Sequence, residues 1–121
     1  MQDDDKYTET FRPVSLRDPP PVSIQSGDGT IWAHPNNGHV RVEAGVALEF
    51  TCANLFELEI RQIGGTKQDW PPLEVLRDGE RFVCTTKVPN CTADPGPYYK
   101  YTIKVGELTL DPIIIVDKKP H

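Results

Sequence analysis

In residues 94–117, DPGPYYKYTIKVGELTLDPIIIVD, two kinds of side chain alternate from Tyr98 to Val105, and Gly106 and Pro112 interrupt the chain after them. One set consists of Tyr99, Tyr101, Ile103 and Val105, and the other of Tyr98, Lys100, Thr102 and Lys104. Successive side chains of a β-strand point to opposite faces. The alternation therefore predicts a strand with the first set in a core and the second set pointing outward.

The residues after this strand predict a hairpin that returns along it. Gly106-Glu107 suits a two-residue type II′ turn, because glycine tolerates the positive φ required there. Pro112 has no N–H, so it marks a sheet edge, a bulge or a fresh strand start. The unbroken apolar run 113–116 predicts a segment covered on both faces. Because a lone hairpin is barely stable in water, the rest of the chain must supply strands that pair with it or pack on it.

The remaining chain predicts further short strands separated by turn residues. These strands lie at residues 22–25, 31–34, 40–43, 46–52, 56–61 and 81–88, with an edge strand within 70–76. No stretch carries a helical apolar stripe, and without crossover helices parallel pairing is disfavoured. The expected fold is all-β, an antiparallel Greek-key β-sandwich of seven to nine strands, with a barrel as the other common closure. The strand at 46–52 is poor in charge and is expected to pair edge to edge between subunits.

Composition narrows the class of protein. A chain of 121 residues makes one domain with a core of its own, and 12 prolines and 9 glycines suit many short strands. The net charge is −5 and the 13 Lys and Arg residues are scattered, which argues against a nucleic-acid partner and against an anionic membrane surface. No apolar run approaches the roughly 18 residues of a membrane-spanning helix, so no membrane association is expected.

Residues 1–21 differ from the rest of the chain, which is expected to form the sandwich as residues 22–121. They are acidic and then rich in proline, ending in Asp18-Pro19-Pro20-Pro21. Two interpretations stay open: a solvated tail, or an arm that docks on the domain or on a neighbouring subunit. The start of the chain lacks a signal-peptide pattern. A cytoplasmic protein is expected if Met1 is the native start, and an exported one if a leader has been removed.

The three cysteines, Cys52, Cys84 and Cys91, are an odd number, which fits a reducing compartment. Cys52 and Cys84 fall on the apolar face of their strands, so buried free thiols are expected. A bridge between Cys84 and Cys91 is the alternative.

Three stretches carry a resemblance to known families. Residues 40–52, VRVEAGVALEFTC, resemble the early strands of immunoglobulin-like and cupredoxin-like sandwiches. Asp94-x-Gly96-x-Tyr98 is similar to the corner in which a tyrosine hydroxyl ties a strand to the preceding loop, although Lys100 stands in place of the antibody-type cysteine. The ending at 110–116, LDPIIIV, is similar to bacterial β-sandwich proteins of the DP-EP family. The resemblance implies a fold and no activity.

Residues able to hold a metal or perform catalysis are sparse. A blue-copper site needs two histidines, a cysteine and usually a methionine, but the loop and strand at 89–105 contain neither His nor Met. His34 and His39, with Asp69, are weighed as zinc ligands, although exposed loop histidines are the better interpretation. His121 lies at the chain end. Without a nucleophile elbow or a phosphate-binding loop, we expect no catalytic residue, no metal and no cofactor.

Three aromatic residues, Trp32, Trp70 and Tyr98, are the expected binding residues, because they fall in or beside predicted loops. Tryptophan and tyrosine anchor protein interfaces and stack on sugar rings, although Trp32 and Trp70 can also simply cap the core. The expected function is a non-catalytic binding or assembly module that binds a protein partner or self-associates as a homo-oligomer. The alternatives are a carbohydrate-binding module and, third, a small metal-dependent or hydrolytic enzyme.

Overall fold

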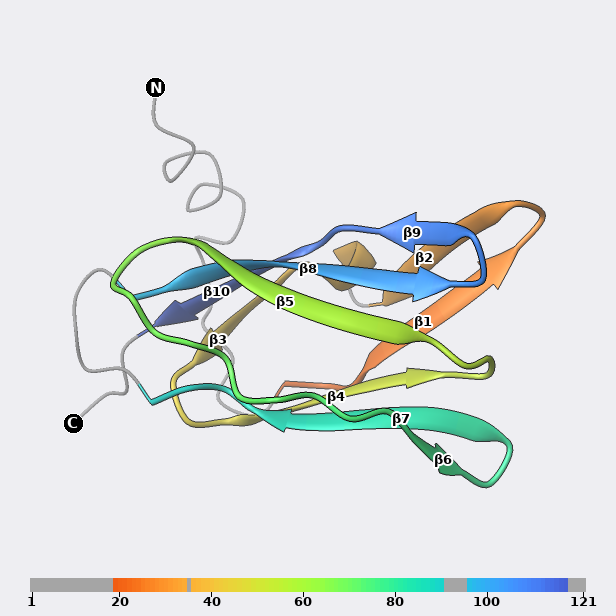
Figure 1. Ribbon diagram of the computed structural model, residues 1–121, viewed down its shortest axis with the longest axis horizontal. Helices are drawn as coiled ribbons and strands as arrows, with labels where there is room; N and C mark the ends of the chain where they lie inside the picture. The colour runs from red at the N-terminus through yellow and green to blue at the C-terminus, as the bar shows by residue number, and fades with distance from the viewer. Residues whose placement is uncertain (1–18, 35, 91–95, 118–121) are drawn as a thin grey trace.

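The structure is a computed structural model that describes residues 19–34, 36–90 and 96–117. These residues form ten strands and one short 3₁₀ turn, arranged as a two-sheet β-sandwich (Figure 1). The elements are β1 (Val22–Gly27), β2 (Thr30–His34), η1 (Asn36–Gly38), β3 (Val40–Glu43), β4 (Ala47–Cys52), β5 (Glu57–Gly64), β6 (Leu76–Asp78), β7 (Arg81–Lys87), β8 (Tyr98–Val105), β9 (Leu108–Leu110) and β10 (Ile113–Asp117). The β4 sheet has the order β2-β1-β4-β7-β6. The β8 sheet has the order β3-β10-β8-β5, and β9 also pairs with β8.

The predicted hairpin at the end of the chain is confirmed. Val105 pairs with Leu108 across the Gly106-Glu107 turn, and Gly106 has a φ of 60°. β10 continues the return along β8 after Pro112, with Ile114 opposite Tyr99. The Pro112 carbonyl still accepts a hydrogen bond from the Tyr101 amide at 2.9 Å. Residues 113–116 are buried on both faces, as the absence of alternation predicts.

Two strand pairs are parallel, which the expectation of an antiparallel sandwich did not include. β1 runs parallel to β4, with Val22 opposite Phe50, and β3 runs parallel to β10, with Val40 opposite Ile114. A parallel pair needs a long connection, usually a helix. Here other strands provide it: the chain leaves β1, passes through β2 and η1, and crosses to β3 in the other sheet before it enters β4.

Two expectations about individual strands are wrong. β4 pairs with β1 on one side and with β7 on the other, so the strand at 46–52 has no free edge for pairing between subunits. Within 70–76 only Leu76 is in a strand, at the start of β6, while residues 70–75 are irregular. Leu73 and Val75 of this segment pack against the core, and the proline pair Pro71-Pro72 prevents a regular ladder.

Two tyrosines of β8 connect the core to distant loops. Tyr101 is fully buried and makes an edge contact with Phe50 of the facing sheet, with ring centroids 5.3 Å apart. Its hydroxyl donates to the carbonyl of Gly38. Tyr99, two residues earlier on the same face, donates its hydroxyl to the carbonyl of Gln68. A buried hydroxyl needs a partner, so these bonds fix the positions of both loops. Burial also raises the pKa of Tyr101 far above its ordinary value.

Replacing Tyr101 with phenylalanine is expected to destabilise the fold by about 1–3 kcal/mol, because the Gly38 carbonyl loses its buried donor. Urea unfolding gives the free energy change, and the amide signals of Gly38 and His39 report the loop. The control is Ile103→Val on the same strand, which shrinks the core without removing a hydroxyl. If Tyr101→Phe unfolds at the wild-type urea midpoint, the hydroxyl does not hold the loop.

Candidate functional site

The structure places the three expected binding residues on three different surfaces. Trp32 lies on β2 opposite Gln25 and points outward from the β4 sheet, since its neighbour Ala33 is in the core. Tyr98 points outward from the β8 sheet. Trp70 packs against the core in the segment that links the two sheets. These residues therefore do not form a single aromatic platform, and each is assessed separately.

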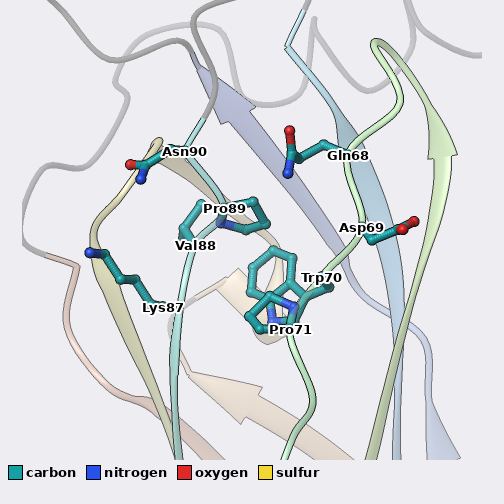
Figure 2. Close-up of a pocket in the computed structure, with 8 residues that line it drawn as sticks. All are labelled: Gln68, Asp69, Trp70, Pro71, Lys87, Val88, Pro89 and Asn90. Atoms are coloured by element: carbon teal, nitrogen blue, oxygen red, sulfur yellow. The ribbon is translucent and has the colours of Figure 1, made fainter.

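Trp70 lines an open groove of about 420 Å³, which we call the Trp70 groove. It is lined by Gln68, Asp69, Trp70, Pro71, Lys87, Val88, Pro89 and Asn90. Figure 2 shows Trp70 and Pro71 on one wall and the ring of Pro89 on the other. The carboxylate of Asp69 points away from Trp70. The walls formed by Trp70, Pro71 and Pro89 are thus apolar, and the polar ends of Lys87 and Asn90 also point away from Trp70 (Figure 2).

The indole ring of Trp70 is held in place by two core residues. Its Nε1 donates to the Oγ1 of Thr86 on β7 at 2.9 Å. Its ring meets Tyr99 of β8 edge to face, with centroids 5.0 Å apart and an angle of 82° between the planes. Both contacts come from buried side chains. The ring is therefore pre-positioned, and a ligand would not have to order it.

A side chain that sequence reasoning missed, Gln62, shapes the loop before Trp70. Its amide nitrogen donates to the carbonyls of Gly64 at 2.9 Å and Thr66 at 2.7 Å. Its amide oxygen accepts from the Gln68 backbone N–H at 3.0 Å. The sequence pattern of β5 indicated this role, because Leu58, Ile60 and Gln62 lie on the same face of the strand. Gln62 is thus a polar residue at the end of an apolar row. A glutamine there predicts internal hydrogen bonds.

The histidines considered as zinc ligands have different environments. His34 is exposed on β2. His39 is half-buried, and its Nδ1 accepts a hydrogen bond from the Ile113 backbone N–H at 3.1 Å. Asp69 is exposed and lines the Trp70 groove, and its Oδ1 lies 3.9 Å from the Nζ of Lys67. Across residues 19–34, 36–90 and 96–117, no three His, Cys, Asp or Glu side chains are grouped so that they could hold a metal ion.

The cysteines that the structure describes are Cys52 and Cys84, and both are buried free thiols, as expected. Burial raises the pKa of the Cys84 thiol, which keeps it protonated and unreactive near neutral pH. Because Cys84 is free, the alternative of a bridge to Cys91 is not formed. Cys91 itself, and the first half of the corner motif at 94–98, lie outside the described residues.

By its fold this chain belongs to the class of two-sheet β-sandwiches. Comparison with protein-family models, with curated proteins and with solved structures found no match to it. The resemblances to immunoglobulin-like, cupredoxin-like and DP-EP proteins therefore stay predictions. Within the described part of the chain, no helix has the length and apolar character needed to traverse a bilayer.

The contact of His39 predicts a pH dependence of stability. Burial lowers the pKa of His39 below its ordinary value of 6.5. Below pH 6.5 the unfolded chain therefore binds this proton more readily than the folded chain does. The stabilising contribution of neutral His39 is complete above pH 6.5 and declines as the pH falls toward the lowered pKa. The measurement is the urea midpoint as a function of pH.

The test variant is His39→Asn, because asparagine Oδ1 can accept the Ile113 N–H in place of Nδ1 and does not titrate. Its stability is expected to fall less than that of the wild type as the pH drops below 6.5. The exposed His34→Asn variant is the matched control and is expected to follow the wild type. Parallel pH profiles for His39→Asn and wild type would contradict this role of His39.

Proposed function

We propose that this chain is a non-catalytic binding module whose contact site is the Trp70 groove, and that the groove takes an extended segment of a protein partner. The observation that carries the proposal is the immobilised indole of Trp70 at the centre of an open apolar groove. Rigid tryptophans in such positions are typical anchors of protein interfaces, because little entropy is lost when they bind.

The lining of the groove indicates the kind of segment. Trp70, Pro71 and Pro89 offer flat, rigid, apolar walls, which suit apolar or proline-containing segments in an extended conformation. Lys87 and Asn90 line the groove and are exposed, and their side chains point away from Trp70, so they contribute charge and polarity to the surroundings of the groove. The groove is open to solvent.

Two of the sheet edges, β5 and β6, are poorly suited to edge-to-edge self-association. β6, at one end of the β4 sheet, has only three residues. β5, at one end of the β8 sheet, carries the charged residues Glu57, Glu59 and Arg61, and its register shifts between Gln62 and Gly64. Short, charged and bulged edges resist strand addition. Strand addition at β5 and β6 is therefore disfavoured, while β2 and β3 are the end strands on the other side of each sheet.

A carbohydrate ligand is the second candidate for the same groove. Gln68 and Asn90 line the groove together with Trp70, and an aromatic ring can stack on a sugar ring while amide groups bond its hydroxyls. The two candidates differ in the ligand that would perturb the groove, so one titration series distinguishes them.

The test begins with selection of peptides from a random library on the full chain, followed by titration of the selected peptides and of an oligosaccharide panel. Peptides are expected to shift the amide signals of Trp70 and Lys87. Trp70→Phe is expected to weaken peptide binding by roughly tenfold or more, the effect of losing a central aromatic anchor. The matched control is Trp32→Phe, which changes a tryptophan on another surface and is expected to leave affinity unchanged.

Because Trp70 also packs on Tyr99, a second variant keeps the test independent of folding. Lys87→Glu changes only an exposed side chain beside the groove and, by reversing the local charge, is expected to alter the affinity for charged peptides. Shifts in the groove caused only by oligosaccharides would replace the proposal with the carbohydrate candidate. A concentration-dependent dimer abolished by Lys87→Glu would instead make a second copy the partner.

A further inference from the structure

A cluster of large apolar side chains lies on the outer face of the β8 sheet, away from the Trp70 groove. It consists of Tyr98, Ile113 and Ile115, and it is separate from the main core. Tyr99 and Ile114, which alternate with them, point between the sheets. Tyr98 and Ile115 are only 9% exposed and Ile113 only 4%. We call this cluster the outer patch.

The low exposure of the outer patch requires a cover. In a sandwich the second sheet buries one face of the first, and the opposite face normally meets water. Gly64 of β5 explains part of the packing, because a methyl group there would collide with the ring of Tyr98. The ring therefore lies against β5. Packing between the two sheets does not account for the low exposure of Ile113 and Ile115.

The rim of the outer patch is basic on one side. Arg61 of β5 stands directly opposite Lys100 of β8, and Lys100 is opposite Ile113 of the patch. Like charges opposite each other on neighbouring strands destabilise a sheet unless an anionic group lies near them. On the other side Arg41 is bonded to Asp117 at 2.6 and 2.9 Å. A cover with apolar and acidic residues would complement this surface.

We propose that residues 1–18 of the same chain dock on the outer patch and form a third layer over it. Three segments longer than one residue lie outside the described residues, at 1–18, 91–95 and 118–121. Residues 118–121, Lys-Lys-Pro-His, are basic and would meet Arg61 and Lys100 unfavourably. Residues 91–95, CTADP, contain only one cysteine and one alanine as apolar side chains. Residues 1–18 alone have large apolar side chains, Tyr7, Phe11, Val14 and Leu16.

Charge and length fit the same segment. Asp3, Asp4 and Asp5 supply the acidic residues that the pair Arg61 and Lys100 favours. Eighteen residues reach about 60 Å when extended, whereas the two sheets of a sandwich lie about 10 Å apart. The segment can therefore pass from Val22 in the β4 sheet to the outer face of the β8 sheet. This proposal does not rest on the Trp70 groove, which lies on another surface.

The experiment places a nitroxide label on the full chain and measures paramagnetic broadening of amide signals. Thr10→Cys puts the label beside Phe11 without removing an apolar residue, in a Cys91→Ser background, since Cys52 and Cys84 are buried. Signals of the outer patch are expected to broaden strongly, while those of Trp32 on the far sheet stay sharp. The control label, Asp28→Cys on the exposed β1–β2 turn, is expected to leave the patch sharp. A patch that stays sharp with the Thr10→Cys label would overturn the proposal.

A mixed sample separates docking within one chain from docking between chains. Chains that carry the nitroxide but no isotope label are mixed with isotope-labelled chains that carry no nitroxide. Only the amide signals of the isotope-labelled chains are then observed. The patch signals are expected to stay sharp. Broadening in this mixture would mean that the arm of a second copy covers the patch, and the proposal for a single chain would be wrong.

The basic rim is tested by reversing its charge. Arg61→Glu with Lys100→Glu is expected to reduce the broadening of the patch, because the acidic arm would then be repelled. Lys104→Glu, on the same face of β8 but opposite Glu57 and further from the patch, is the matched control and is expected to retain it. Equal effects of the two changes would overturn the role assigned to Asp3, Asp4 and Asp5.

Discussion

The structure depends on the need of two buried tyrosine hydroxyls for hydrogen-bond partners. Tyr99 and Tyr101 are on the core face of β8, and their acceptors are the carbonyls of Gln68 and Gly38, at 31 and 63 residues' separation in sequence. Burying a hydroxyl without a hydrogen-bond partner costs about 1–3 kcal/mol. That is a large fraction of the free energy of unfolding of a small domain. These two bonds therefore fix the positions of two loops against the core. One loop leads into β3, and the other leads into the segment that contains Trp70.

The Trp70 groove is a consequence of the same packing. Tyr99 supports the indole ring from below, Thr86 takes its N–H, and Gln62 fixes the loop that precedes it. The side chains that stabilise the core thus also present the aromatic wall of the groove. A site built in this way is rigid before a ligand binds. Its apolar surface stays exposed because the neighbouring prolines prevent this segment from forming a regular strand.

Local patterns predicted most of the strands, and long-range contacts account for what was missed. The alternation in residues 98–105 and 46–52 located β8 and β4 correctly, because it reports which face of a strand is buried. It contains no information on neighbours, so the parallel pairs and the central position of β4 were not predicted. The three aromatic residues were chosen from their type, and the sheet order places them on separate surfaces. Gln62 was overlooked although its place in an apolar row signalled a structural role.

The two parallel pairs also connect the ends of the domain to its middle. β1, the first strand, lies alongside β4, and β10, the last strand, lies alongside β3. β1 and β10 belong to different sheets, so each sheet contains one terminal strand. Without β1, β2 would lose its pairing, and without β10, β3 would lose its own. Neither sheet is therefore complete until its terminal strand is in place.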